Sequence, residues 1–176
     1  MSKNNIILIG FMGSGKSAIG KALKNISGFQ LVDTDTLLEQ RLKTTINDIF
    51  ETKGEPFFRE QETVTLESIQ NIEKSIISTG GGIVLKPKNT AILKELGKVF
   101  WLNVSAETVL KRVQEDNNRP LLASPNRFQI ITDLLAKRHN NYKNASDYEI
   151  DTNYKNIEEI SKEIWKIYNQ DTCKPA

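Results

Sequence analysis

The feature that most constrains this chain is a glycine-rich octapeptide that stands between an apolar run and a helical pattern. Residues 10–17 read Gly-Phe-Met-Gly-Ser-Gly-Lys-Ser and match G-x-x-x-x-G-K-[ST] directly after the apolar run 6–9. Glycines let backbone N–H groups converge on phosphate oxygens, and the helix that begins near Lys16 directs the positive end of its dipole toward them. The octapeptide therefore predicts a nucleoside triphosphate site rather than a plain tight turn. The expected contacts are Gly13, Ser14, Gly15, Lys16, Ser17 and Ala18, with Lys16 on the outer phosphates and the Ser17 hydroxyl on Mg²⁺.

The rest of the chain alternates strand-like runs with helical patterns, which is typical of an α/β protein with a parallel sheet. The expected strands are residues 6–9, 29–32, 75–78, 98–104 and 148–150. The expected helices are residues 17–24, 36–43, 45–54, 57–72, 89–96, 106–114, 125–137 and 157–168. Thr45 and Asp48 are predicted to form a capping box, and Ser124 with Pro125 is predicted to start a helix.

Two stretches depart from this alternation. Residues 34–72 are too long for one crossover helix and predict a helical insertion between the second and third strands. Residues 114–125 are polar, lack apolar periodicity and predict a mobile flap. Because ligands bind beyond the carboxyl ends of the strands in open α/β sheets, both stretches are expected to cover that edge as lids. We expect one domain over residues 1–170 and a frayed tail over 171–176.

Composition and charge exclude several other classes of protein. Lys and Arg number 24 against 22 Asp and Glu, and the resulting net charge of +2 is too small to indicate nucleic-acid binding. The apolar run 6–9 is too short to cross a membrane. The single Cys173 and the single His139 argue against a disulfide, a cysteine-based zinc site and a histidine-centred triad. We expect a cytoplasmic protein that binds a small molecule. We also expect a monomer, because the sequence has no long exposed apolar stripe of the kind that an obligate dimer would bury.

Two carboxylates follow the second expected strand in the sequence Val32-Asp33-Thr34-Asp35. On an extended segment, side chains at i and i+2 point the same way, so both carboxylates are predicted to lie over the ligand edge. One is then expected to hold the water shell of a metal while the other accepts a hydroxyl proton. The alternative, which is compatible with ligand contact, is that Asp35 caps the helix expected to begin at Thr36.

Three consecutive glycines, Gly80, Gly81 and Gly82, follow the third expected strand. They let the backbone approach a ligand closely and offer N–H groups to an anion. A plain turn before the next helix explains them equally well.

Three arginines are further candidates, namely Arg59, Arg119 and Arg138. Each is by itself compatible with a solvated surface position. Arg119 has the best position of the three, because it lies in the polar flap with Pro120 directly after it.

These residues together make the chain resemble the shikimate kinase family, from Ile6 to about Asn169. The resemblance is carried by six short motifs, which are given at the end of this paragraph. The first of them, residues 10–17, by itself indicates a P-loop kinase, whereas all six in this order and at this spacing are specific to the family. The resemblance implies a nucleoside-monophosphate-kinase-like, three-layer P-loop kinase fold with a five-stranded parallel sheet flanked by helices. It also implies ATP-dependent phosphorylation of the 3-hydroxyl of shikimate, to shikimate 3-phosphate and ADP, on the route to aromatic amino acids. The six motifs are residues 10–17, Asp33-Thr-Asp35, Phe57-Phe58-Arg59-x-x-Glu62, Gly80-Gly81-Gly82, Arg119-Pro120-Leu121-Leu122 and Arg138-x-x-x-Tyr142.

For the nucleotide, the resemblance implies that Lys16 and the loop amides hold the phosphates of ATP, and that Ser17 and Asp33 hold Mg²⁺. It implies that Arg119 closes onto the transferring phosphate. The adenine contacts that it implies are Arg112 and the Asp151-Thr152-Asn153 loop. The family often has a proline just after this loop, where the chain has Asn156 and Ile157. This departure does not affect the residues of the phosphate site.

For the acceptor, the resemblance implies that Asp35 binds the shikimate hydroxyls and serves as the base. Arg59 and Arg138 would grip the substrate carboxylate with the backbone of Gly81 and Gly82. This agrees with the residue chemistry, because a guanidinium binds a carboxylate through two hydrogen bonds and an ammonium does not. The pocket residues implied are Phe50, Phe58, Glu62, Pro120 and Leu121.

Two other functions stay open at this point. One is a kinase of the same fold that acts on another small acceptor, such as gluconate or a nucleoside monophosphate. The set of Asp33-x-Asp35, Arg59 and the triple glycine argues against it. The other is a nucleotide-dependent binding module without catalysis. The presence of Lys16, Asp35 and Arg119 argues against that module.

Overall fold

The computed structural model describes residues 4–113 and 126–172. Residues 114–125, where the sequence predicts the flap that carries Arg119, Pro120 and Leu121, lie outside the described residues. The strands are β1 (Ile6–Ile9), β2 (Gln30–Asp33), β3 (Ser75–Ser78), β4 (Lys98–Asn103) and β5 (Tyr148–Asp151). The helices are α1 (Lys16–Ser27), α2 (Thr34–Leu42), α3 (Ile46–Ser68), η1 (Ile83–Leu85), α4 (Pro87–Leu96), α5 (Ala106–Val113), α6 (Arg127–Ala145) and α7 (Ile157–Thr172).

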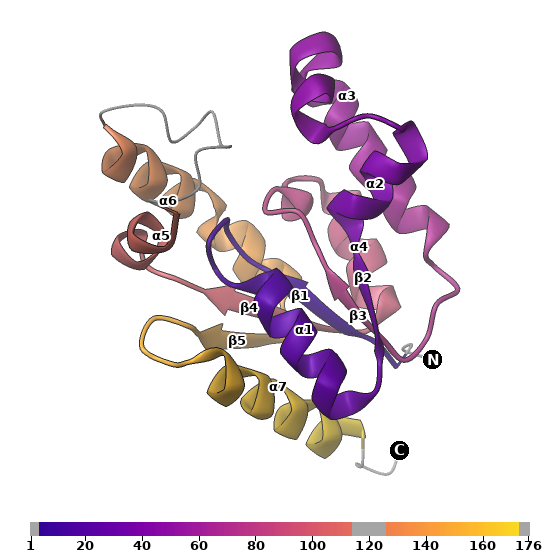
Figure 1. The fold of residues 1–176 in the computed structure, drawn as a ribbon, viewed down its shortest axis with the longest axis vertical. Helices are drawn as coiled ribbons and strands as arrows, with labels where there is room; N and C mark the ends of the chain where they lie inside the picture. The colour runs from indigo at the N-terminus through magenta and orange to yellow at the C-terminus, as the bar shows by residue number, and fades with distance from the viewer. Residues whose placement is uncertain (1–3, 114–125, 173–176) are drawn as a thin grey trace.

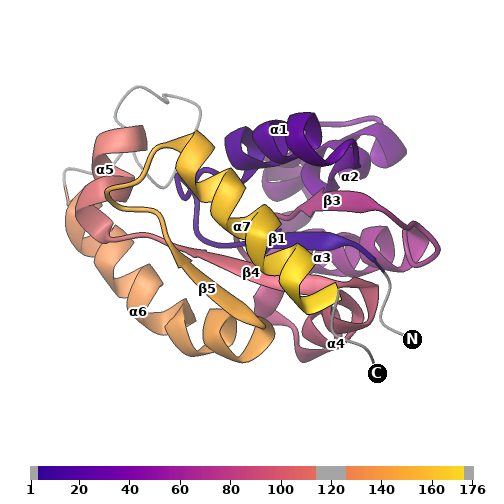
Figure 2. The ribbon, with the colours of Figure 1, turned by 90° about the horizontal axis from the view of Figure 1, so that it is seen from below.

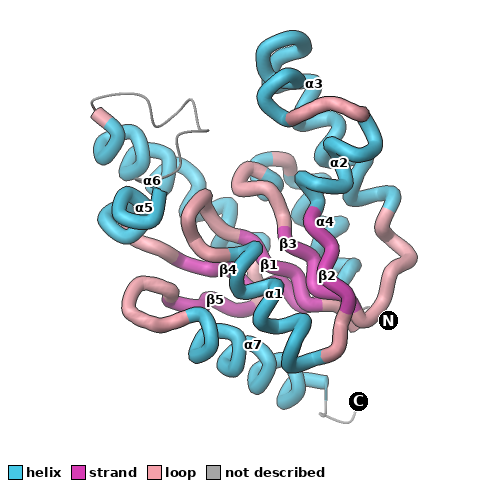
Figure 3. Tube along the Cα trace, viewed as in Figure 1, coloured by secondary structure: helices cyan, strands magenta, loops and turns pink. Residues whose placement is uncertain are grey.

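In these ranges the chain forms a parallel sheet of five strands in the order β2-β3-β1-β4-β5 (Figures 1 and 3). The central strand β1 pairs with β3 through Ile6 opposite Ile76, and with β4 through Ile6 opposite Lys98. Because every pair is parallel, the carboxyl ends of the strands meet at one edge of the sheet. The predicted fold class is confirmed.

The two faces of the sheet are buried under different helices, which makes three layers (Figure 2). Ile7 and Ile9 of β1 pack on one face with side chains from α3, α4 and α6. Ile6 and Leu8 alternate onto the other face and pack against α1 and α7. A strand that is apolar at every position must be covered on both sides, which is why the run 6–9 occupies the centre of the sheet.

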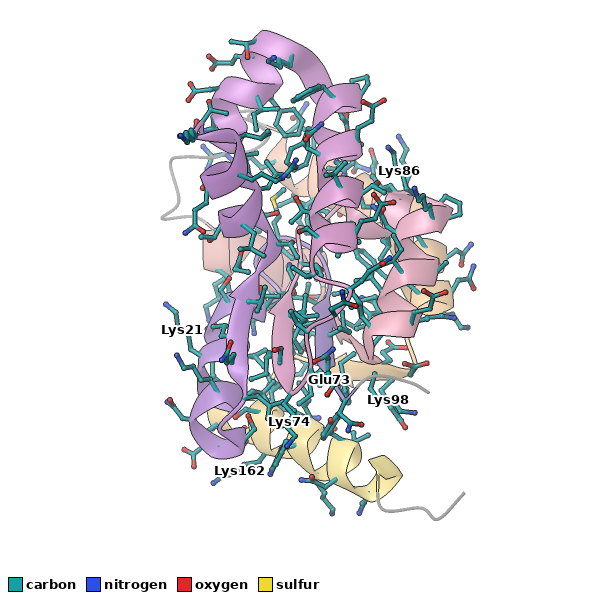
Figure 4. All side chains as sticks on the ribbon, turned by 90° about the vertical axis from the view of Figure 1, so that its right-hand side faces the viewer. Lys21, Glu73, Lys74, Lys86, Lys98 and Lys162 are labelled. Atoms are coloured by element: carbon teal, nitrogen blue, oxygen red, sulfur yellow. The ribbon has the colours of Figure 1, made fainter. Side chains whose placement is uncertain are left out.

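The insertion predicted over residues 34–72 is formed by α2 and α3, which pack side by side above the sheet edge (Figures 1 and 4). The capping box is confirmed, since Thr45 Oγ1 accepts from the Asp48 N–H at 3.1 Å and the Asp48 carboxylate accepts from the Thr45 N–H at 3.4 Å. The two helices predicted on either side of Gly54 are confirmed: α3 contains both of them, and they are separated by a kink at Gly54, whose φ of 78° and ψ of 172° are not helical. The element ends at Ser68 rather than Ile72.

Other boundaries differ from the predictions where the sequence signal is weak. Helix α6 continues from Arg127 to Ala145, beyond the predicted end at Lys137, because Tyr142 and Ala145 extend its buried face. Helix α7 continues to Thr172, into the predicted frayed tail. Among the helices of the described ranges, none has the length and apolar character needed to span a bilayer.

Candidate active site

The predicted phosphate loop joins the end of β1 to the start of α1. The backbone φ is positive at Gly10 (148°), Gly13 (73°) and Gly15 (95°), a region that glycine enters at little steric cost. Gly15 is the N-cap residue of α1, and no described side chain caps this helix end. The first N–H groups of α1 are therefore suited to bind an anion, and the loop turns its backbone toward the same point.

The side chains of the loop also fit a phosphate group. Lys16 Nζ donates to the carbonyl oxygens of Gly10 at 2.7 Å and Phe11 at 2.9 Å, so the ammonium is held against the loop. The hydroxyl of Ser14 is buried and has no hydrogen-bond partner among the described residues. A buried polar group without a partner costs about 1–3 kcal/mol and is rare in folded proteins. A bound phosphate would supply both the partner and the countercharge. Ser17 and Ala18 follow in the first turn of α1 and are exposed.

Asp33 and Asp35 lie at the carboxyl end of β2, in a geometry that the sequence did not predict. Asp33 Oδ1 accepts hydrogen bonds from the N–H groups of Asp35 at 3.1 Å and Thr36 at 3.2 Å, so Asp33 is the N-cap of α2. The alternative that Asp35 caps this helix was therefore wrong. So was the extended segment through both residues, because capping by Asp33 starts α2 at Thr34 and places Asp35 in its first turn.

The oxygen donors predicted to hold Mg²⁺ are the exposed Ser17 hydroxyl and the Asp33 carboxylate, whose Oδ2 is not used by the cap. Within residues 4–113 and 126–172, no group of three or more His, Cys, Asp and Glu side chains forms a metal-binding cluster. Mg²⁺ usually keeps several waters and takes one or two protein ligands beside phosphate oxygens. The residues thus fit a magnesium ion that is shared with a nucleotide, and do not fit a metal held by protein alone.

The turn after β3 lies against two carboxylates from the insertion. A Cβ on Gly80 would stand 2.7 Å from Asp35 Oδ1 and 3.0 Å from Glu62 Oε1, so any other residue would require the Asp35 carboxylate to shift. The Gly80 N–H donates to Thr34 Oγ1 at 3.3 Å, which ties this turn to the start of α2. The close approach of Asp35 and Glu62 is therefore a physical reason for glycine here, beyond the plain turn.

Arg59 of α3 reaches the same turn and is fixed by two ion pairs. Its Nη1 lies 2.7 Å from Glu62 Oε2 and its Nη2 lies 2.9 Å from Glu55 Oε1. Burial opposes the charge of Arg59, but the ion pairs with Glu62 and Glu55 outweigh burial and raise its pKa. The guanidinium also lies over the ring of Phe58, 5.1 Å from the ring centre. A Cβ on Gly82 would collide with this guanidinium, so Arg59 and the turn are in direct contact.

Glu62 is a buried carboxylate with one unsatisfied oxygen. Its side chain is 3% exposed, and Oε1 has no hydrogen-bond partner among the described residues. Burial raises the pKa of Glu62, Arg59 offsets part of that rise, and the nearby charge of Asp35 adds to it. A carboxyl group of this kind holds its proton to higher pH than an exposed glutamate does.

This shift predicts a pH dependence of stability that Glu62→Gln removes. Because the pKa is raised in the folded state, the stabilising contribution is complete below the ordinary pKa and is lost as the pH rises through the folded value. The free energy of unfolding of the natural chain, minus that of Glu62→Gln, is expected to fall as the pH rises from about 4, near the ordinary pKa of a glutamate, through the raised pKa of the folded state. Urea unfolding of both proteins across this range measures the difference.

Glu158→Gln is the matched control for that experiment. Hydrogen bonding to Lys162 lowers the pKa of the exposed Glu158, so its stabilising contribution is present above the ordinary pKa and is lost as the pH falls. The corresponding difference should therefore rise with pH. A difference for Glu62→Gln that also rises, or that stays constant, would contradict the burial argument.

Arg138 and Tyr142 approach the turn from α6 on the opposite side. Arg138 Nη1 donates to the carbonyl oxygen of Gly81 at 3.4 Å, and the Tyr142 hydroxyl donates to the same oxygen. The guanidinium of Arg138 lies over the ring of Phe11, 5.5 Å from its centre. A Cβ on Gly81 would lie 3.4 Å from the backbone nitrogen of Met12, so the turn also touches the phosphate loop. Both predicted carboxylate-binding arginines are thus placed at one glycine turn.

Arg112 lies on the other flank of the phosphate loop. Its Nη1 donates to the carbonyl oxygen of Gly13 at 3.1 Å, and its Nη2 donates to that of Thr152 at 2.6 Å. Burial lowers the pKa of Arg112. Asn153 is also engaged by protein, since its Oδ1 accepts from the Ser105 N–H at 2.8 Å. These bonds join the phosphate loop to the loop after β5, where the adenine contacts are predicted.

One predicted pocket residue is exposed, and three predicted residues lie outside the described ones. Phe50 is exposed and packs against Phe58, with ring centres 4.7 Å apart. Arg119, Pro120 and Leu121 lie outside the described residues. The sequence analysis did not predict the hydrogen bond from the Tyr142 hydroxyl to the carbonyl oxygen of Gly81. The spacing of Arg138 and Tyr142, one helical turn apart, was the signal that could have found it.

A glycine-rich loop that leads from a central parallel strand into a helix, with acidic and basic side chains at the same sheet edge, defines a P-loop kinase. The shikimate kinase family model matches residues 12–169. A shikimate kinase from Caldicellulosiruptor bescii is 42% identical over 164 residues, which cover 93% of this chain and 95% of that protein. The structure of shikimate kinase from Acinetobacter baumannii in complex with shikimate has a TM-score of 0.91 and 34% identity, over 98% of this chain and 96% of that one. The chain belongs to the shikimate kinase family.

A more distant likeness concerns the fold alone. A gluconokinase from Sinorhizobium meliloti has a TM-score of 0.60 and 14% identity, over 96% of this chain and 93% of that one. At this identity the likeness to the gluconokinase stops at the architecture. The family predicted from the six motifs is confirmed.

Proposed function

We propose that this chain catalyses the ATP-dependent phosphorylation of the 3-hydroxyl of shikimate, giving shikimate 3-phosphate and ADP. The observation that carries the proposal is the glycine turn after β3. Arg59, Arg138 and Asp35 approach it from three different helices, and its middle glycine touches the phosphate loop. An acceptor with a carboxylate and several hydroxyls needs cations at one end and a hydroxyl acceptor at the other.

On the nucleotide side, Lys16 and the N–H groups at the start of α1 would bind the phosphates of ATP. Ser17 and Asp33 would hold Mg²⁺, which when bound neutralises charge on phosphate oxygens. Arg119 is proposed to contact the transferring phosphate. Phosphoryl transfer needs little covalent chemistry from the protein, so these residues act by positioning and by charge.

On the acceptor side, Arg59 and Arg138 would bind the shikimate carboxylate, with the Gly82 N–H between them. Asp35 would accept the proton of the 3-hydroxyl as its oxygen forms a bond to the γ-phosphorus and the bond from that phosphorus to ADP breaks. Glu62 holds Arg59 at 2.7 Å and would keep this guanidinium oriented before the substrate arrives. The site is then largely preorganised on its acceptor side.

The experiment that tests this function is a coupled assay of ADP release with a panel of acceptors. Shikimate should support turnover, and gluconate and nucleoside monophosphates should not. Turnover with gluconate or a nucleotide in place of shikimate would assign another acceptor to the same fold. Nucleotide binding without ADP release from any acceptor would favour the non-catalytic module.

Arg138→Lys is expected to weaken shikimate binding much more than nucleotide binding. A guanidinium makes two parallel hydrogen bonds to a carboxylate, and an ammonium of the same charge does not. Losing one charge-assisted bond costs about 1.5–3 kcal/mol of binding free energy, which raises the shikimate dissociation constant by roughly 10- to 150-fold. Calorimetric titration with shikimate and with ADP measures both effects.

Arg127→Lys, at the exposed start of the same helix, is the matched control and should leave both constants unchanged. Equal losses of affinity for shikimate and ADP in Arg138→Lys would refute the proposed carboxylate contact.

We also propose that the enzyme works as a monomer in the cytoplasm. The large exposed apolar side chains of the described residues, among them Ile26, Val64 and Leu85, are spread over α1, α3, η1, α6, α7 and the loop before α7. Scattered apolar residues are ordinary on the surface of a monomer. A single cysteine in the chain is in keeping with a reducing compartment.

A further inference from the structure

Tyr142 is a buried tyrosine whose hydroxyl reaches the substrate side of the sheet edge. Its side chain is 1% exposed, and its ring stacks on Trp101 of β4 with ring centres 5.8 Å apart and planes 16° apart. Its hydroxyl donates to the carbonyl oxygen of Gly81. Burial raises the pKa of Tyr142 to about 12, so the phenol keeps its proton and remains a donor at neutral pH.

The hydrogen bond acts on the peptide between Gly81 and Gly82. The described residues contain no cis peptide bond, so this peptide is trans and its C=O and N–H groups point in opposite directions. With the carbonyl of Gly81 held toward α6, the N–H of Gly82 is turned away from α6. Two adjacent glycines have no side chains to restrain the rotation of this peptide. The Ile83 N–H donates to the Gly80 carbonyl at 3.2 Å and closes the turn, and the Tyr142 hydroxyl adds a restraint from outside it.

Arg138 shares the acceptor. A carbonyl oxygen has two lone pairs, and the Arg138 Nη1 contact of 3.4 Å is the longer and weaker of the two bonds to it. Arg138 precedes Tyr142 by one turn of α6, so the two side chains lie on the same helix face. The Tyr142 hydroxyl is therefore the stronger restraint on Gly81, and Arg138 also hydrogen-bonds to this hydroxyl.

We propose that Tyr142 is a positioning residue for the acceptor: its hydroxyl orients the Gly81–Gly82 peptide so that the Gly82 N–H donates to the substrate carboxylate between Arg59 and Arg138. The inference rests on the proposed function for the identity of the acceptor. Orientation of the peptide itself does not depend on that identity. A purely structural tyrosine would act through its ring, whereas this role belongs to the oxygen atom alone.

Tyr142→Phe separates the two roles, because phenylalanine keeps the ring and its stacking on Trp101. Losing one neutral hydrogen bond that orients a donor is expected to raise the shikimate dissociation constant roughly three- to tenfold. The ADP dissociation constant, and turnover at saturating shikimate, should change by less than about twofold. The matched control is Tyr168→Phe, a buried tyrosine on α7 beneath the other face of the sheet, which should change none of these quantities.

A second measurement on the ligand-free protein keeps the inference testable whatever the acceptor is. The amide resonance of Gly82 in a ¹H–¹⁵N spectrum should shift in Tyr142→Phe and stay in place in Tyr168→Phe. An unmoved Gly82 resonance, an unchanged shikimate constant in a folded Tyr142→Phe, or equal losses for shikimate and ADP would each overturn the inference. If the natural chain itself fails to bind shikimate, the proposed function falls, and the Gly82 resonance alone decides the role of Tyr142.

Discussion

Asp35→Asn is expected to lower turnover with shikimate by roughly 10²–10⁴, the contribution typical of a general base. Asparagine keeps the size of the side chain and removes both its charge and its capacity to accept a proton. The structure separates this effect from folding, because the N-cap of α2 is Asp33 and the cap does not require the Asp35 side chain. Steady-state assays of ADP release, combined with thermal unfolding, measure activity and stability on the same preparation.

Asp133→Asn, an exposed carboxylate on α6, is the control for removing one negative charge and should leave turnover unchanged. Near-normal turnover of a folded Asp35→Asn protein would show that Asp35 positions the substrate without serving as the base. A large rise in the shikimate dissociation constant with turnover at saturation preserved would lead to the same conclusion.

Lys16→Met is expected to lower turnover by roughly 10²–10³ and to weaken nucleotide binding, while shikimate binding is retained. The Lys16 ammonium is the one cation that the described phosphate loop carries, and it is held there by the carbonyl oxygens of Gly10 and Phe11. Methionine preserves the apolar stem and removes the charge that would stabilise the phosphates as negative charge redistributes toward ADP.

Lys21→Met is the matched control, because Lys21 lies on the same helix and points outward into solvent (Figure 4). Calorimetric titration with ADP and with shikimate, together with turnover, distinguishes the roles. Equal behaviour of the two variants would remove Lys16 from the phosphate site. Loss of shikimate affinity to the same extent as nucleotide affinity would indicate a collapsed loop instead of a missing charge.

Local signals along the chain were sufficient for the architecture and for the phosphate loop. The apolar run 6–9 has no polar face, so it had to be buried on both sides, and it is the central strand. The octapeptide after it carries glycines at the positions where φ is positive, and the conformation of the loop follows from that local property. The capping box of Thr45 and Asp48 was predicted for the same reason, since its partners are three residues apart.

The roles of Asp33 and Asp35 show where such signals end. Both residues are suited to the N-terminus of a helix. If the helix begins at Thr36, Asp35 is its N-cap; if it begins at Thr34, Asp33 is the N-cap and Asp35 lies in the first turn. Thr34 Oγ1 accepts the N–H of Gly80 from the turn after β3, which is far away in the sequence, and this contact helps to set the start of α2 at Thr34. No pattern within residues 32–36 contains that information.

The family motifs predicted the residues of the acceptor side, and the bonds among those residues were not predicted. Arg59 and Glu62 are three residues apart on one helix, so their ion pair follows from local spacing once the helix is known. The bond from Tyr142 to Gly81 joins residues that are 61 positions apart.

Residue type and short-range spacing thus decided the fold class, the phosphate loop and the list of candidate side chains, because helices, strands and glycine loops follow local rules. Other properties were decided only by the packing of α2, α3 and α6 around the sheet edge. They are the capping of α2 by Asp33, the burial of Glu62 with one unsatisfied oxygen, and the contact of the Tyr142 hydroxyl with the Gly81–Gly82 peptide. Those properties depend on burial and on distances between segments remote in sequence, and both exist only after the chain has folded.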